Sequence, residues 1–150
     1  MNRDFIWFKK AAHMSNMSTS SITYVGCVAV YKGHIIGYGC NMGKTHPIQK
    51  KYNCYRNEWD GWGNNGLSTI HAEMATLIMI KNTIGFENIN PTKIKLYVYR
   101  QKKDGTFGMS RPCNACMKAI IDCGIKDIYY TTDSGFAHEH LENCILGGVA

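Results

Sequence analysis

The sequence has no long apolar run, no internal repeat and no low-complexity tract. No stretch approaches the roughly 18 to 20 consecutive apolar residues that a membrane-spanning helix requires. The opening residues, MNRDFIWFKKAAHMSN, lack the apolar core and the small-residue cleavage site of a secretory signal peptide. We therefore expect a soluble, cytoplasmic protein with no membrane partner.

Cysteine is plentiful but its count does not suit a disulfide framework. There are seven cysteines, an odd number, and no export signal accompanies them. Reduced thiols, some of them bound to metal, fit this count better. Four cysteines lie among apolar or small residues, where a free thiol acts as a small hydrophobic side chain: Cys27, Cys40, Cys123 and Cys144.

Length and charge set broad limits on the kind of protein. The 150 residues suit one domain, residues 1–150, that buries its own core. Seventeen basic residues against 11 acidic ones give a net charge of +6. This excess favours anionic ligands such as nucleotides or nucleic acid, although a solvated basic surface explains it equally well.

Hydrophobic periodicity predicts alternating helices and strands. Phe5, Ile6, Phe8 and Ala12 are spaced as in an amphipathic helix that ends near residue 15. The next apolar segment predicts a hairpin that turns at Lys32-Gly33, with strands covered on both faces. The later predicted elements are a long loop at 42–68, a buried helix at 69–84 capped by Ser68 or Thr69, a strand at 93–101, a helix at 113–123 closed by Gly124, a strand at 126–132, and a short helix around 138–144.

This order indicates an α/β fold with three layers, α/β/α. The sheet is mixed and has four to five strands, and its last two predicted strands are parallel through a helical crossover.

The stretch IHAEMATL places His71 and Glu73 at the start of the buried helix. A buried histidine and glutamate cost free energy unless they are paired, hydrogen-bonded or bound to a metal. The stretch RPCNACMKAI places Cys113 and Cys116 on one face at the start of the next helix, where thiols ionise more readily and so bind metal.

Two thiolates and one imidazole make three protein ligands, and a catalytic zinc site keeps its fourth position for water. Zinc lowers the pKa of bound water from 15.7 to roughly 7. Glu73 is then placed to move protons from that water to an amidine base, at C4 of cytosine or C6 of adenine. Each half of the pattern is weak evidence alone. C-x-x-C also occurs in redox pairs, but the Trp-Cys-Gly-Pro context of those pairs is missing here.

With these motifs, the chain resembles the cytidine and deoxycytidylate deaminase superfamily from its first helix to Thr132. The resemblance implies a five-stranded mixed sheet between helices, a zinc ion held by His71, Cys113 and Cys116, and Glu73 as the proton shuttle. After Thr132 only 18 residues remain, so the fifth strand is expected to be short or missing.

The resemblance also implies substrate contacts. Asn41 is placed like a family asparagine that touches the sugar, although it is equally a routine turn residue. Tyr129, Tyr130 and Asp133 lie where the family reads the base, although the tyrosines also fit ordinary strand alternation. A second, structural zinc is not expected, because His46 and Cys54 supply two ligands, with His34 or Cys40 as possible helpers.

Cations and rings near the predicted zinc site suit either a mononucleotide phosphate or stacked bases of a single-stranded nucleic acid. They are Lys44, His46, Lys50, Lys51, Tyr52, Tyr55, Arg56, Trp59, Trp62, Arg100, Lys102, Lys103 and Arg111. A nucleotide such as dCMP is preferred, with cytosine or adenine in DNA or RNA, including tRNA, as the alternative. A binding module that zinc merely stabilises is the alternative from another class. Because Phe5, Trp7 and Phe8 place rings on more than one helix face, a homo-oligomer is expected.

Overall fold

The computed structural model describes residues 3–19, 23–55 and 69–141. Along these residues the elements are α1 (Arg3–Ser15), β1 (Tyr24–Tyr31), β2 (His34–Cys40), α2 (Pro47–Tyr52), α3 (Ala72–Asn82), β3 (Ile94–Gln101), α4 (Asn114–Asp122), β4 (Asp127–Thr132) and β5 (Gly135–His140). Short 3₁₀ turns lie at Asn53–Tyr55, Phe86–Asn88 and Pro91–Lys93.

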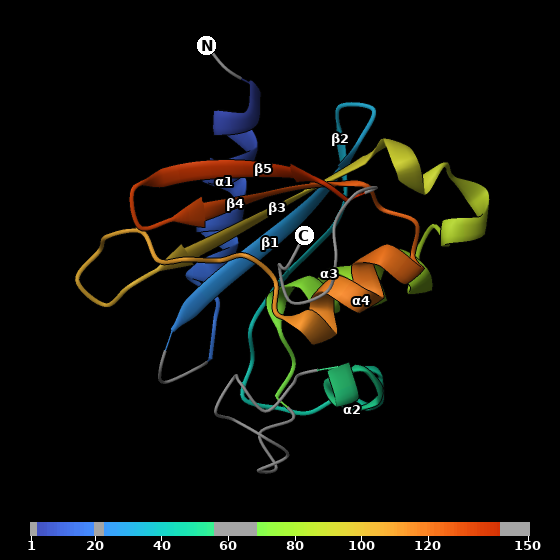
Figure 1. Ribbon diagram of the computed structural model, residues 1–150, viewed down its shortest axis with the longest axis horizontal. Helices are drawn as coiled ribbons and strands as arrows, with labels where there is room; N and C mark the ends of the chain where they lie inside the picture. The colour runs from blue at the N-terminus through green and yellow to red at the C-terminus, as the bar shows by residue number, and fades with distance from the viewer. Residues whose placement is uncertain (1–2, 20–22, 56–68, 142–150) are drawn as a thin grey trace.

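The strands form a five-stranded sheet in the order β2-β1-β3-β4-β5. β3 and β4 are parallel, and the other neighbouring pairs are antiparallel. Helix α1 covers one face of the sheet, and α3 and α4 cover the other (Figure 1). The predicted three-layer α/β/α arrangement, with a mixed sheet and a parallel crossover, is therefore confirmed. No helix within the described ranges is both long enough and apolar enough to cross a membrane.

The first hairpin turns where the sequence predicts. Lys32 and Gly33 have φ angles of 50° and 81°, the left-handed pair that a two-residue hairpin turn requires. β1 is buried along most of its length. The prediction of two covered faces is wrong for β2, because this strand lies at the sheet edge and leaves Ile35 and Tyr38 39% and 47% exposed.

Helix α1 is confirmed, but a different stripe of it is buried. Phe8, Ala11 and Ser15 are the buried residues, spaced three and four apart. Phe5 and Ile6 are each 43% exposed. Aromatic spacing alone did not identify the buried face, because small residues form the closest contact with the sheet. Burial of this helix against another chain stays a prediction.

Two segments have a different secondary structure from the one predicted. Residues 138–140 belong to β5 and not to a helix, because they pair with residues 127–129 of β4. His138 and His140 both hydrogen-bond to Oδ1 of Asp127 on β4, at 2.8 and 3.0 Å. The fifth strand is thus present, with six residues. Residues 142–144 of the predicted helix lie outside the described residues.

The predicted loop at 42–68 contains helix α2. The ring of His46 accepts a hydrogen bond from the backbone N–H of Ile48 at 3.1 Å, and Pro47 occupies the first helical turn. A helix of six residues is too short to show periodicity in its sequence. Residues 56–68 lie outside the described residues.

Helix α3 starts later than predicted. Its N-cap is His71, while Thr69 lies in an isolated β-bridge and Ser68 falls outside the described residues. Helix α4 agrees with its prediction to within one residue at each end, and Gly124 follows it with a φ of 88°. The difference at α3 matters because it places the histidine directly at the helix start.

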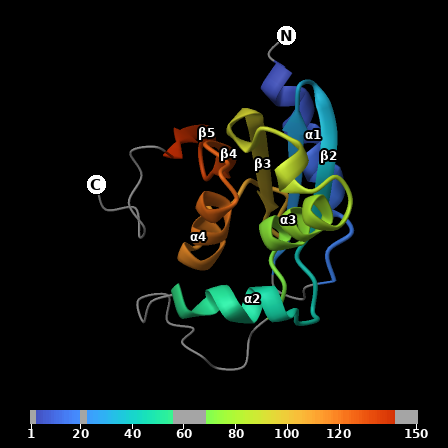
Figure 2. The same ribbon diagram turned by 90° about the vertical axis from the view of Figure 1, so that its right-hand side faces the viewer.

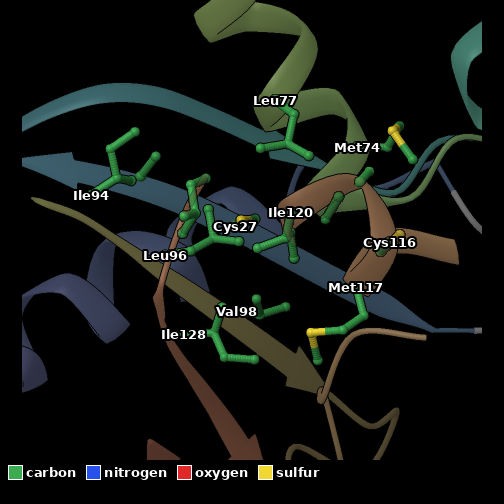
Figure 3. Packing of buried hydrophobic residues seen from close by; sticks show 14 of the residues in the cluster. Cys27, Met74, Leu77, Ile94, Leu96, Val98, Cys116, Met117, Ile120 and Ile128 are labelled. Atoms are coloured by element: carbon green, nitrogen blue, oxygen red, sulfur yellow. The ribbon is translucent and has the colours of Figure 1, made fainter. Parts of the chain in front are cut away.

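The main core lies between the sheet and helices α3 and α4 (Figure 3). Its labelled side chains are at most 4% exposed: Cys27, Met74, Leu77, Ile94, Leu96, Val98, Cys116, Met117, Ile120 and Ile128. Cys116 belongs to this cluster, so core packing itself holds one of the predicted metal ligands in place.

We expect Gly26→Ala to destabilise the protein by about 1 to 3 kcal/mol. A Cβ at this position of β1 would overlap the backbone of Ala11 and Ser15 in α1. Urea unfolding measures the loss. Gly43→Ala is the matched control, because its Cβ would meet only Thr19 Oγ1, at 3.9 Å. Equal unfolding midpoints for the two variants would contradict this close contact.

Candidate metal centre and active site

Two helix starts meet beside the core. His71 precedes α3 in an extended conformation, and its side chain makes no capping hydrogen bond. Cys113 is the N-cap of α4, and Cys116 lies in the first turn. Nδ1 of His71 is 3.5 Å from Sγ of Cys113 and 3.3 Å from Sγ of Cys116. The three donor atoms lie within 4.8 Å of one another, so the structure brings the predicted ligands together.

The two sulfurs differ in their readiness to ionise. A hydrogen bond with Cys116 lowers the pKa of the Cys113 thiol well below its usual value, and the His71 ring lowers it further against the effect of burial. The same bond, together with burial, raises the pKa of Cys116. The neighbouring Cys116 and His71 thus favour a thiolate at Cys113, the form that binds metals.

Glu73 lies two residues after His71 and is 5% exposed. Burial raises the pKa of its carboxyl to about 7, an effect that the His71 ring reduces and Cys113 increases. The charge of this carboxyl also raises the pKa of Cys116, so it interacts electrostatically with the donor cluster. A buried carboxyl beside a donor cluster is suited to proton transfer.

The donor chemistry fits a zinc ion. One imidazole and two thiols are ligands that zinc prefers, and three protein donors leave one tetrahedral position open, as in catalytic zinc sites. Within the described ranges, this is the group of histidine, cysteine and acidic side chains that converges closely enough to hold a metal.

Alternation along β4 separates the two predicted tyrosines. Tyr130 packs in the same cluster as Cys116, on the face covered by α3 and α4. Tyr129 packs on the α1 face, where its ring stacks between Tyr97 and His138 with centroid distances of 4.6 and 4.3 Å. The structure therefore brings Tyr130 to the face of the metal centre and places Tyr129 on the opposite face.

Arg111 and Asp133 are both in ion pairs. Arg111 donates from Nε and Nη2 to the carboxylate of Glu139, at 2.6 and 3.2 Å. Burial is the main cause of the raised pKa of the Tyr130 phenol; Glu139 raises it further and Arg111 lowers it. Asp133 lies in the turn after β4, 3.3 Å from Nζ of Lys102. Contact of these residues with a substrate stays a prediction.

Asn41 follows β2, and its side-chain amide hydrogen-bonds to the main chain nearby. Its Oδ1 accepts from the N–H of Val25 at 3.0 Å, and its Nδ2 donates to the carbonyl of Thr23 at 2.9 Å. Ser18 also donates to this oxygen. These bonds tie the end of β2 to the start of β1, and a contact with a substrate sugar stays a prediction.

The cations and rings of the predicted loop lie partly on α2. Lys50, Lys51 and Tyr52 belong to α2, Lys44 precedes it, and Tyr55 lies in the 3₁₀ turn that follows it. Arg56, Trp59 and Trp62 lie outside the described residues. Of the residues considered for a second zinc, His46 caps α2 and Cys54 is exposed, with its Sγ donating to the carbonyl of Lys51.

Sequence reasoning missed Gln49. This residue of α2 is fully buried, and its Oε1 accepts a hydrogen bond from the backbone N–H of His71 at 3.0 Å. Its Nε2 donates to Oδ1 of Asn53 at 2.8 Å. No pattern in the sequence indicates this contact, since a glutamine between an isoleucine and two lysines reads as a surface residue.

The fold and the donors define an α/β protein with a candidate metal site at two helix starts. A family model described as the cytidine and deoxycytidylate deaminase zinc-binding region matches residues 1–132. The chain therefore belongs to the cytidine and deoxycytidylate deaminase family. A comparison with curated protein sequences gave no match.

Solved structures agree with this family at the level of the fold. The chain is similar to a dCMP deaminase from the cyanophage S-TIM5, with a TM-score of 0.58 and 21% identity over 88% of this chain and 86% of that chain. It is also similar to a cytidine deaminase from Burkholderia pseudomallei, with a TM-score of 0.60 and 16% identity over 93% of each chain.

We expect Cys113→Ala to lose bound zinc, because two remaining donors do not hold the ion. Metal analysis of purified protein after dialysis measures the zinc content per chain. Cys27→Ala is the matched control, since Cys27 is a buried cysteine of β1 outside the donor cluster. Full zinc content in Cys113→Ala would remove Cys113 from the ligand set.

Proposed function

We propose that the protein is a zinc-dependent hydrolytic deaminase that converts a cytosine base to uracil, with a (deoxy)cytidine nucleotide such as dCMP as its substrate. One observation carries this proposal: Glu73 is a buried carboxyl two residues after His71, and its charge interacts with His71 and Cys113 of the donor cluster. A structural zinc site has no need of a carboxyl at this place.

In this proposal Glu73 moves the protons. Its carboxylate accepts a proton from the attacking water and delivers it to a ring nitrogen of the base, and a further proton goes to the departing amino group. The products are a carbonyl compound and ammonia. A zinc ion held by His71, Cys113 and Cys116 would act as a Lewis acid and make water acidic enough to react near neutral pH.

Two observations support a nucleotide substrate. The dCMP deaminase from cyanophage S-TIM5, with 20% identity to this chain and a TM-score of 0.58, was crystallised in complex with dCMP and dUMP. The exposed lysines Lys44, Lys50 and Lys51 lie on or beside α2, whose Gln49 contacts His71. Lysine side chains are suited to a phosphate group. They also suit a nucleic-acid backbone, so single-stranded DNA or RNA is the alternative substrate.

We expect dCMP to be converted faster than deoxycytidine, a cytosine-containing single-stranded oligonucleotide or an adenosine-containing tRNA anticodon stem. The phosphate of dCMP adds charge-assisted contacts that the nucleoside lacks. Ammonia release and base conversion on zinc-loaded protein measure each rate. Faster conversion of the oligonucleotide or the tRNA stem would move the substrate class to nucleic acid.

We expect Glu73→Gln to lower turnover by about 100-fold or more, because a glutamine does not take up the proton. Zinc content and unfolding temperature should stay near the wild-type values. Glu87→Gln is the matched control, since it makes the same change on an exposed side chain beyond the far end of α3.

Normal deamination by Glu73→Gln would remove Glu73 from the mechanism. Failure of the wild type to convert any substrate, with one zinc per chain confirmed, would favour a nucleic-acid-binding module that zinc stabilises.

A further inference from the structure

We propose that α2 is a clamp for the metal centre, in which Gln49 is a positioning residue for His71. The inference rests on the proposed function, since it assigns His71 to the metal. It concerns helix α2, which lies below α3 and α4 in Figure 2 and contacts α4.

The start of α3 needs an outside partner. The backbone N–H of an N-cap residue is often satisfied by a Glu or Gln side chain three residues later, as in the capping box. Here His71 is the N-cap, and the residue three later is Met74, which is fully buried in the core and has no acceptor for that N–H. Oε1 of Gln49 fills the role from α2, at 3.0 Å.

Gln49 is itself held firmly. Its side chain is fully buried, and its Nε2 is bonded to Oδ1 of Asn53, one helical turn along. Both ends of the side-chain amide are therefore used, one on Asn53 and one on His71. Because buried polar groups are costly to leave unpaired, this arrangement strongly favours a single position of the His71 backbone.

The same helix also contacts α4. The phenol of Tyr52 donates to Oδ2 of Asp122, at the end of α4, at 2.8 Å. Burial and this bond raise the pKa of Tyr52 to about 12. Lys118 of α4 is paired with the same carboxylate at 2.9 Å. Helix α2 thus bonds to the element that carries the histidine donor and to the one that carries the cysteine donors.

Main-chain bonds fix the segment that leads into α2. Met42 donates to the carbonyl of Ile70 at 3.1 Å, and Ile70 donates to the carbonyl of Lys44 at 2.8 Å. A β-bridge joins Thr45 to Thr69. The chain that leads into α2 is therefore bonded to the residues that lead into His71.

The first test is zinc release from the loaded full-length protein into excess chelator. Gln49→Met keeps the size of the side chain and removes both hydrogen bonds. We expect zinc to leave this variant about tenfold faster or more, the usual effect of losing a group that orients a ligand. Thr76→Val is the matched control, because it removes a fully buried hydroxyl of α3 whose hydrogen bond goes to the carbonyl of Ala72.

Rescue separates positioning from general stability. Gln49→Glu keeps an acceptor for the His71 N–H, and a rotated Asn53 amide can donate to it. We expect zinc release within about threefold of the wild type for this variant. Tyr52→Phe, which loses the bond to Asp122, should release zinc faster than the wild type but more slowly than Gln49→Met.

Hydrogen exchange of the His71 amide gives a second readout that requires neither metal nor turnover. We expect exchange in Gln49→Met to be about fivefold faster, the equivalent of one ordinary hydrogen bond. Zinc release and amide exchange equal to those of Thr76→Val would overturn the clamp. If the wild type converts no tested substrate but the Gln49 variants show these effects, the proposed function is overturned and the clamp stands.

Discussion

The site depends on one geometric constraint, which is that the first turns of α3 and α4 converge beside one face of the sheet. Helix α4 is the crossover between the parallel strands β3 and β4, and α3 packs on the neighbouring strands β1 and β2. His71 and Cys113 sit at the N-caps of these helices, so a small shift of either helix separates the donor atoms. Cys116 is packed in the shared core, so the packing of this core also sets the position of one metal donor.

The sheet places the two neighbouring tyrosines of β4 in different environments. Tyr129 stacks with Tyr97 on the α1 face, whereas Tyr130 turns toward the core beneath α3 and α4. In the proposed enzyme, groups that bind substrate therefore come from the second face or from the segments at the helix starts. We predict that the Arg111–Glu139 ion pair and the lysines of α2 are among these groups.

The sequence predicts the local parts of this arrangement well. The spacing of His71 with Glu73 and of Cys113 with Cys116 is set within single helical turns, and hydrophobic periodicity identifies the helices that carry them. It does not identify β5, because the bond pattern of His138 and His140 with Asp127 is a cross-strand property. The sequence does not identify the buried face of α1 for a similar reason. That face depends on the close approach of the helix backbone to Gly26 of β1.

The contact of helix α2 with the start of α3 could not be predicted from the sequence, for a physical reason. At the start of α3, the position that would ordinarily supply a polar capping side chain is Met74, and the core requires an apolar residue there. One side chain does not serve both needs, so the capping group comes from another segment. Gln49 supplies it because the hydrogen bonds of Met42, Ile70 and Lys44 carry α2 to that place. A tertiary contact thus resolves a conflict between core packing and helix capping, and it does so at the residue that we assign to the metal.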